Sequence, residues 1–408
     1  MLEVIKNIIN KNLYTVSLYA RQMAGTLVLF VIARYLSVYD FGLFSSYKNI
    51  AAFCFMFANL GFAEYILVSS QANVKEVKLK ISLFMLNAIV IAFLINICSL
   101  FFKLDSHLLF WLVVVRTFFD STFFALILSY FQAAKKFNQI AIINIIYAVC
   151  IAIIAIISFI FKLSLIKFLI LNIILGLLNF IQCSFLANIN YLIMLCYFKR
   201  FLKMLDKTII NYSLVEIACL LYIQIQSIFV SCYLPKEDAA LYFSAFTIAS
   251  VISLFIAAQR QKLVPELIFV KSKDIKSILK KNLFSSCKVI SAFAIVFIFG
   301  GKYILNFLYG HNYYANAYFV LILFTISTFF TAAIAITGTY FTAINKVYKK
   351  TPLQIESIFV AVISLMLLKS YGIYGATISY FLTAIYLAIR YTYSVNKEIN
   401  INIQKENK

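Results

Sequence analysis

The sequence predicts an all-α polytopic membrane protein with about twelve transmembrane helices. Hydrophobic residues make up 64% of the 408 residues and charged residues only 12%, so a water-exposed surface could not cover the apolar side chains. The apolar residues fall in long continuous runs, close to the ~20 residues that a helix needs to cross a bilayer. These runs lack the alternation typical of a membrane β-barrel, so helices are the expected spanning element.

The predicted spans follow one another along the chain with short connections between them. Residues 1–12 are expected to form an interfacial lead-in, because Lys and Asn interrupt the first apolar run. The longest connection is expected at 262–281 and the longest external one at 301–316, and both are too short for a catalytic domain. The spans lie near 13–33, 41–63, 81–102, 108–131, 139–161, 166–194, 208–231, 240–261, 282–300, 317–343, 353–369 and 373–393.

Positive charges are distributed unevenly between alternate connections. Of the 36 Lys and Arg residues, 23 lie in one alternate set of connections, which includes both termini, and seven lie in the other. Lys and Arg concentrate on the cytoplasmic side of membrane proteins, so both termini are expected in the cytoplasm. The net charge of +21 is divided among short clusters, and no nucleic-acid partner is expected.

A short sequence occurs twice, 198 residues apart. YLSVYDFGLFSS at 35–46 and YLPKEDAALYFS at 233–244 align without a gap. Each copy opens the second span of a six-span half. The halves therefore have like orientation and form two lobes, 1–200 and 201–408, which in such proteins usually pack around a central cavity. Asp40 and Asp238 are expected to cap the helices that follow them.

Four cations inside the predicted spans indicate a positively charged cavity. A charge at the bilayer centre costs ~2.5–3.5 kcal/mol and usually faces protein or water. Lys48 and Lys288 have an alternative, because long side chains can reach the headgroups. A cationic cavity suits an anionic, phosphate-bearing substrate. The candidate binding residues are Arg21, Lys48, Arg116 and Lys288.

Two carboxylates and one amide accompany these cations. Asp120 lies four residues after Arg116, on the same helix face, so the two form either a structural ion pair or part of a functional site. Glu216 and Gln224 lie on one polar face of the span 208–231, and Gln224 joins the candidate binding residues. Asp120 and Glu216 are the candidate titrating groups if transport is coupled to protons or sodium ions.

Sequence motifs of enzymes and motors are absent. The chain contains no P-loop, no G-x-G-x-x-G, no H-E-x-x-H and no C-x-x-C, and only two histidines. No cofactor and no metal site are therefore expected. The sequence favours a carrier over an enzyme.

Several segments together resemble the bacterial polysaccharide flippases. The repeated Leu-x-x-x-Asp-x-x-Leu-aromatic-x-Ser resembles the signature of Wzx-type transporters in the multidrug/oligosaccharidyl-lipid/polysaccharide superfamily. ANLGFAEYIL at 58–67 is similar to the end of the family's second helix, with Asn59 where Asp is common. Two further matches are GGKYILNFLYGHNYYANAYFVLILF at 300–324 and YGIYGATISYFLTAIYLAIRY at 371–391.

The resemblance implies a flippase that works by alternating access. Its expected substrate is an undecaprenyl-diphosphate-linked oligosaccharide repeat unit, as in O-antigen synthesis, moved from the inner to the outer leaflet of the bacterial cytoplasmic membrane. It implies contact with membrane lipids, and with a polysaccharide polymerase and a chain-length regulator as partners.

Three alternatives remain open from the sequence. A multidrug antiporter of the same superfamily would favour an acidic, aromatic cavity. The lipid II flippase of the superfamily usually has two further helices. An integral membrane glycan polymerase or ligase, which typically needs a large external loop, is the alternative from a different class.

Overall fold

The computed structural model describes residues 2–59, 74–123, 127–128, 130–131, 134, 136–187, 207–268, 270, 272–310, 312–344 and 346–406. Within these ranges every regular element is a helix, and each of the twelve predicted spans overlaps mainly one α-helix, although the α-helix in the span 108–131 covers only His107–Thr117. The all-α class is therefore confirmed. The predicted lobe boundary at 200/201 and most of the 58–67 segment lie outside the described residues.

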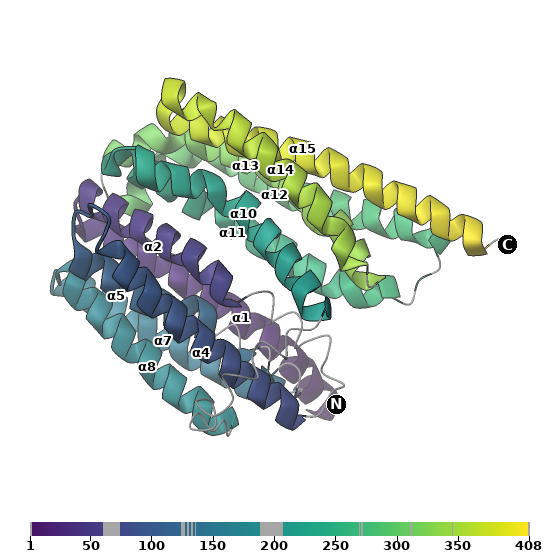
Figure 1. The fold of residues 1–408 in the computed structure, drawn as a ribbon, viewed down its shortest axis with the longest axis horizontal. Helices are drawn as coiled ribbons and strands as arrows, with labels where there is room; N and C mark the ends of the chain where they lie inside the picture. Colours follow the sequence, from purple (N-terminus) through teal and green to yellow (C-terminus); the bar gives the residue numbers. More distant parts are fainter. Residues whose placement is uncertain are drawn as a thin grey trace. The chain divides into compact units, whose positions relative to one another are not determined.

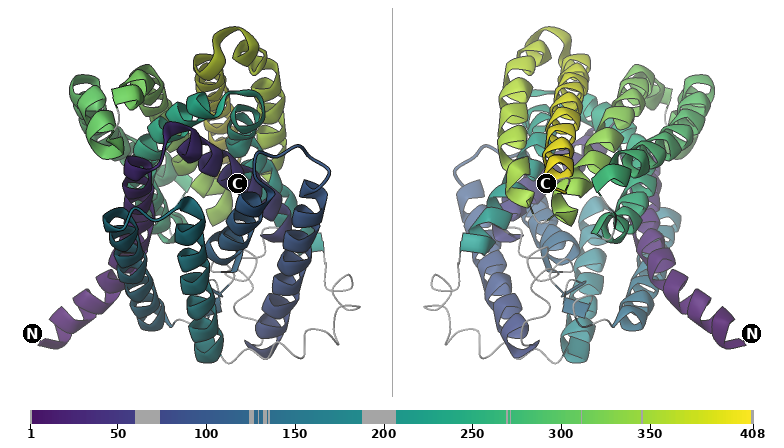
Figure 2. Two further views of the ribbon diagram at one scale, coloured as in Figure 1. Left: turned by 90° about the vertical axis from the view of Figure 1, so that its left-hand side faces the viewer. Right: turned by 90° about the vertical axis from the view of Figure 1, so that its right-hand side faces the viewer.

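The chain divides into two compact units, Met1–Ile217 and Ala218–Lys408. In the first unit, α1 packs along α7, α2 packs against α4 and α5, and α8 packs against both α5 and α7. The helices α7 and α8 run side by side in both views (Figures 1 and 2). The bounds are α1 Leu2–Tyr35, α2 Val38–Asn59, α4 Val74–Ser99, α5 His107–Thr117, α7 Phe137–Ile160 and α8 Leu165–Ala187.

In the second unit, α13 packs against α11, α12 and α15, and α14 packs against α15. The helix α10 crosses the boundary between the units. The bounds are α10 Lys207–Tyr233, α11 Lys236–Ile268, α12 Ser272–Tyr309, α13 Tyr318–Ala343, α14 Lys350–Ser364 and α15 Met366–Glu406.

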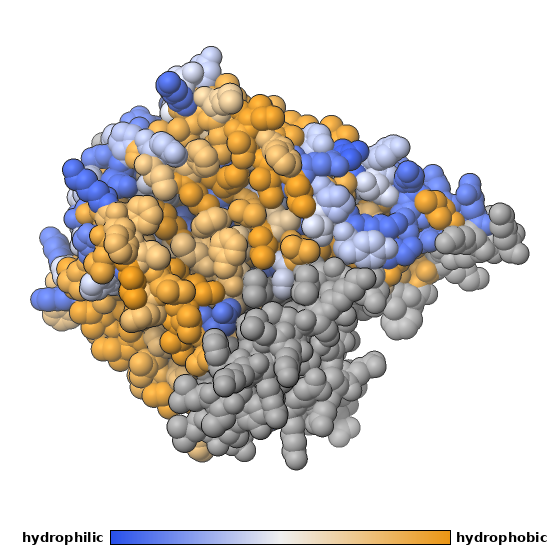
Figure 3. Space-filling view, viewed as in Figure 1, coloured by the Kyte–Doolittle hydropathy of each residue, from blue (hydrophilic) through white to orange (hydrophobic). Residues whose placement is uncertain are grey.

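The helices have the dimensions and composition of membrane spans. Among the described residues, eight helices are long and apolar enough to cross a membrane; α2, α4, α5 and α14 are shorter or less apolar there. In Figure 3 apolar side chains cover the middle of α14 and α15, and hydrophilic ones gather over the C-terminal part of α15. The chain is a multi-pass membrane protein.

Two predicted connections are helical instead. The predicted connection 262–281 is wrong, because α11 continues to Ile268 and α12 begins at Ser272. Leu263 and Leu267, and then Ile275 and Leu279, lie four residues apart and are buried in one apolar cluster, so the Lys-rich segment still has a helical apolar face. The predicted connection 301–316 is likewise largely helical. The predicted lead-in, residues 2–12, is helical and continuous with α1, and the stretch of α1 apolar enough to span a membrane begins after it, at Val16.

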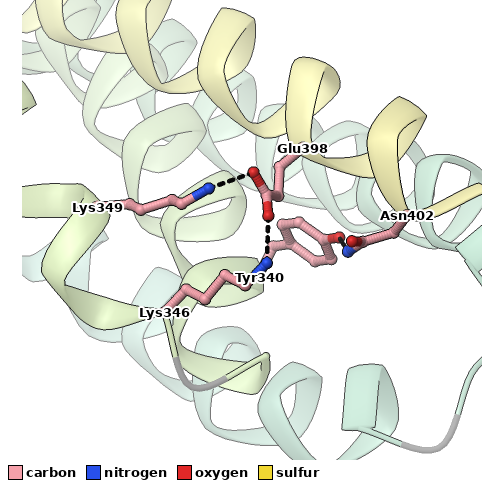
Figure 4. A network of polar contacts seen from close by, with 5 residues as sticks. All are labelled: Tyr340, Lys346, Lys349, Glu398 and Asn402. Atoms are coloured by element: carbon pink, nitrogen blue, oxygen red, sulfur yellow. Dashed lines mark hydrogen bonds and ion pairs between the residues drawn. The ribbon is translucent and has the colours of Figure 1, made fainter. Parts of the chain in front are cut away.

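The C-terminal end of α15 also extends beyond its predicted span, and polar contacts hold it. Figure 4 shows Glu398 of α15 between Lys346 and Lys349, which precede α14, and both lysines form ion pairs with its carboxylate. One turn further along, the Asn402 side-chain amide donates to Tyr340 Oη of α13 at 2.8 Å. These contacts fix the helical extension to the rest of the second unit.

The repeated sequence marks matching helix starts. The helices α2 and α11 begin at Val38 and Lys236, which are 198 residues apart like the two copies. The predicted capping role of Asp40 needs correction. Ser37 Oγ accepts from the Asp40 N–H at 3.0 Å and donates to Asp40 Oδ2 at 2.6 Å. Serine is therefore the cap and Asp40 its partner in the first turn, while Pro235 replaces the serine in the second copy.

Candidate functional site

An acidic side chain in the first unit links residues from three elements. Asp120 lies in η1 (Phe118–Phe123), a π-helix that directly follows α5. Its Oδ2 lies 3.3 Å from Arg116 Nε, so the predicted i,i+4 pair is present. The hydroxyl of Tyr147, on α7, donates a hydrogen bond to Oδ1. The carboxylate therefore contacts a cation and a phenol at the same time.

The third element is α1, which contributes Arg21. The Arg21 Cζ lies 3.8 Å from the centroid of the Tyr147 ring, well within the range of a cation–π contact. Arg21 also interacts electrostatically with Asp120. One turn away on each helix, the Asn144 amide donates to Ser17 Oγ at 3.4 Å. The packing of α1 on α7 thus places Arg21 against the Tyr147–Asp120 pair.

Arg116 is buried beside two aromatic rings. It is 8% exposed, and its Cζ lies 5.5 Å from the Phe44 ring centroid and 5.6 Å from that of Phe168. Its Nη1 is buried and has no hydrogen-bond partner among the described residues. Arginine offers five N–H donors in a planar fork, so part of this donor set is buried without a hydrogen bond in the described part of the chain.

Lys48 of α2 adds a third cation. Its side chain is exposed, and it interacts electrostatically with both Arg116 and Asp120. Three cations, Arg21, Lys48 and Arg116, therefore surround one carboxylate. The set formed by these residues with Asp120 and Tyr147, called the cationic cluster below, carries a net charge of two positive units. Such an excess inside a membrane protein favours an anionic ligand.

The π-helix that carries Asp120 depends on a close helix contact. A Cβ at Gly176 of α8 would lie 2.8 Å from the Phe119 Cβ, so glycine lets Phe119 approach α8. Single π-turns within α-helices are frequent at functional sites. The predicted continuous helix over 108–131 is therefore interrupted by η1 at the position of Asp120.

The other predicted site residues lie on α10 and α12. Glu216 and Gln224 are half-buried on α10, where Ser213 and Ser227 are buried. Lys288 lies on α12 in the second unit, exposed, with its Nζ 4.7 Å from the Phe284 ring centroid. The structure therefore brings together Arg21, Lys48, Arg116 and Asp120 of the predicted residues.

Sequence reasoning missed two polar contacts. Tyr147 is one of 27 tyrosines and is neutral, so a search for charges could not find it. In the second unit, Arg390 of α15 donates to both carboxylate oxygens of Glu356 on α14, at 2.7 and 2.8 Å. Both residues lie near the ends of predicted spans, where charges are ordinary. Within the described ranges, no group of three or more His, Cys, Asp or Glu could hold a metal ion.

Comparison with known proteins gives a family and a fold. The family model described as polysaccharide biosynthesis protein matches residues 8–268. No protein of curated function matches the chain.

Solved structures share the fold along nearly the whole chain. The lipid II flippase MurJ in an inward closed conformation is 17% identical with a TM-score of 0.71, over 94% of this chain and 87% of that chain. An inward-facing multidrug resistance MATE family transporter of the MOP superfamily is 13% identical with a TM-score of 0.68, over 94% and 96%. A MOP superfamily transporter from Pyrococcus furiosus is 12% identical with a TM-score of 0.66, over 96% and 94%.

Proposed function

The chain belongs to the polysaccharide biosynthesis protein family, and from this premise we propose that it is a flippase for polyprenyl-diphosphate-linked oligosaccharides. It moves repeat units from the inner to the outer leaflet of a bacterial cytoplasmic membrane by alternating access, with both termini in the cytoplasm. It acts as a transporter and not as an enzyme. A polysaccharide polymerase and a chain-length regulator are the proposed partners.

The observation that carries the proposal is the cationic cluster. A diphosphate has several anionic oxygens, and guanidinium groups bind such oxygens in a bidentate manner. Arg116 has a buried Nη1 without a hydrogen-bond partner in the described part of the chain, and Lys48 is exposed nearby. These two residues are the proposed first contacts of the diphosphate.

Asp120 has the proposed role of an internal anion. Its carboxylate pairs with Arg116 and accepts from Tyr147, which compensates the cationic cluster while no substrate is bound. When the diphosphate binds, it replaces Asp120 as the partner of Arg116, and the Asp120 carboxylate becomes available to a proton or a sodium ion. Glu216 of α10 is the second proposed coupling residue. This exchange links ion binding to the loading of the carrier.

The net positive charge also separates this function from its closest alternative. The solved neighbours include multidrug resistance transporters, and the same fold could carry organic cations. Three cations around one carboxylate repel such cargo, because like charges in a low-dielectric environment interact strongly. Lipid II is a polyprenyl diphosphate as well. A lipid II flippase would therefore differ from the proposed flippase in the glycan that it carries, and the cationic cluster would bind the diphosphate in the same way.

The proposal is tested by locating the lipid-linked intermediate in cells. In a deletion strain we expect repeat units to accumulate on the cytoplasmic leaflet, and expression of the chain should restore their export. Arg21→Ala and Arg116→Ala should fail to restore it while inserting normally into the membrane. Lys103→Ala, which removes an exposed cation of the first unit, is the matched control and should restore export.

Two outcomes would contradict the proposal. Single repeat units that reach the outer leaflet in the deletion strain but stay unpolymerised would indicate a polymerase. Normal export by both arginine variants would remove the cationic cluster from the transport pathway.

A further inference from the structure

The helix α12 is much longer than a membrane span. Its 38 residues correspond to ~57 Å at a rise of ~1.5 Å per residue, whereas the hydrocarbon core is ~30 Å thick. The uncharged stretch 289–301 and the segment that follows it to Tyr309 already supply ~31 Å. The first part of the helix, residues 272–288, therefore continues beyond the hydrocarbon core.

One face of this first part packs on the second unit. Ile275 and Leu279 are 4% and 7% exposed and share an apolar cluster with Leu267 of α11 and Ile399 of α15. Lys276 Nζ donates to Asn400 Oδ1 at 2.9 Å, so the extensions of α12 and α15 run alongside each other (Figure 1). The orientation of the opposite face is fixed by this packing.

The opposite face is basic and points outward. Its residues Lys280, Lys281, Phe284 and Lys288 are all exposed and fall within an arc of about 100° at 100° per residue. Further along α12, the same stripe continues as Ile295 and Phe299, which are 57% and 81% exposed. Exposed apolar stripes of membrane helices face lipid, so the lysines continue the lipid-facing side of α12.

We propose that Lys280, Lys281 and Lys288, together with Phe284, bind anionic phospholipid headgroups of the leaflet at the N-terminal end of α12. Along the helix axis Lys288 lies next to the start of the apolar stretch, and Lys281 and Lys280 lie ~12–14 Å from it. The headgroup layer is ~5–8 Å thick on each side, and long lysine side chains can reach back to it. Phe284, with Lys288 Nζ 4.7 Å from its ring centroid, is the interfacial aromatic between them.

Lys273 distinguishes a lipid surface from a soluble acidic protein. It is exposed on the same face but lies ~24 Å along the helix from the apolar stretch, about two Debye lengths beyond the headgroup layer. Binding to a lipid surface should therefore not depend on Lys273. An acidic protein docked on the whole face would contact it.

The test measures lipid selectivity and does not depend on transport. The purified full-length chain is reconstituted in phosphatidylcholine vesicles that contain spin-labelled phosphatidylglycerol or spin-labelled phosphatidylcholine as the probe. We expect wild type to immobilise phosphatidylglycerol preferentially, and the triple variant Lys280→Gln, Lys281→Gln, Lys288→Gln to lower this preference at least about tenfold, since each lysine near an anionic surface contributes about 1 kcal/mol.

Two matched variants complete the experiment. The charge-conserving triple Lys→Arg variant should keep the preference, and Lys273→Gln should leave it unchanged. The proposal is overturned if the triple Gln variant keeps the wild-type preference, or if Lys273→Gln lowers it as much as the triple variant does. An acidic protein partner would give the first of these results.

Discussion

Tyr147 is the residue that joins the two arginines of the cationic cluster. Its ring lies under Arg21 and its hydroxyl donates to Asp120, which pairs with Arg116. A phenylalanine keeps the ring but cannot donate to the carboxylate. The two contacts of Tyr147 can therefore be separated by one substitution.

We predict that Tyr147→Phe lowers the export of lipid-linked repeat units at least about tenfold, because a hydrogen bond to a charged group contributes ~1.5–3 kcal/mol. Tyr147→Leu, which also removes the cation–π contact, should lower it further. Tyr19→Phe, a half-buried tyrosine of α1, is the control. Equal export by wild type and Tyr147→Phe would show that the Tyr147 hydroxyl does not position Asp120.

Asp120 and Glu216 are the residues at which ion coupling is predicted. In vesicles with an imposed proton or sodium gradient, we expect wild-type flipping to accelerate and Asp120→Asn to lose this acceleration, because an amide cannot exchange a proton or bind a cation through a negative charge. Glu216→Gln tests the second candidate in the same way. If both variants respond to the gradients like wild type, neither residue couples transport to an ion.

At the scale of the element, η1 is the feature on which the position of Asp120 depends. Phe119 fits against α8 only because residue 176 is glycine. A methyl group there must displace Phe119, and Asp120 is the next residue along η1. The helix contact and the cationic cluster are therefore coupled through two adjacent residues.

We predict that Gly176→Ala lowers export by moving Phe119 and Asp120. Gly25→Ala on α1 is the matched control, because a Cβ at Gly25 meets nothing within 4 Å and alanine favours a helix by up to ~1 kcal/mol over glycine. Combining Gly176→Ala with Phe119→Leu should restore part of the loss. Full activity of Gly176→Ala alone would contradict the dependence of Asp120 on this contact.

The helices could be predicted more completely than the contacts between them. Hydropathy locates each span, and the i,i+4 spacing of Arg116 and Asp120 predicts their ion pair. The position of Arg21 beside Tyr147 results from the packing of α1 on α7, which no local pattern encodes. The helical segment 272–281 is predicted as part of a connection because its charges mask the spacing of Ile275 and Leu279.

At the scale of the whole chain, two units have matching helix starts and different polar contacts. The cationic cluster lies in the first unit. In the second unit, Glu398 holds the extension of α15 through Lys346 and Lys349, and Glu356 pairs with Arg390. These contacts favour a structural role for Glu356, Glu398 and the cations that pair with them.

We predict that Glu398→Gln lowers the stability of the detergent-solubilised chain by about 1–3 kcal/mol. The amide cannot form the two ion pairs that the buried Glu398 carboxylate makes with lysines that are partly screened by solvent. The hydrogen bond to Glu398 raises the pKa of Lys346 above its usual 10.5. The stabilisation from the Lys346–Glu398 ion pair is therefore complete below pH 10.5, and it is lost as the pH rises through the raised pKa of Lys346. Thermal unfolding from pH 8 to 12 measures both effects.

Glu266→Gln removes an exposed carboxylate of α11 and serves as the control for this experiment. It should leave the unfolding temperature close to that of wild type. An alkaline loss of stability that is as steep in Glu398→Gln as in wild type would assign the pH dependence to other groups.

Flipping in proteoliposomes tests whether the cationic cluster carries a polyprenyl diphosphate across the bilayer. The measured quantity is the rate at which a short-chain polyprenyl-diphosphate oligosaccharide in the inner leaflet becomes accessible to a glycosidase added outside. We predict rapid exposure by wild type and by Lys103→Ala, and exposure at the rate of protein-free vesicles by the double variant Arg21→Ala, Arg116→Ala. Exposure at the wild-type rate by the double variant would show that the cationic cluster does not carry the diphosphate.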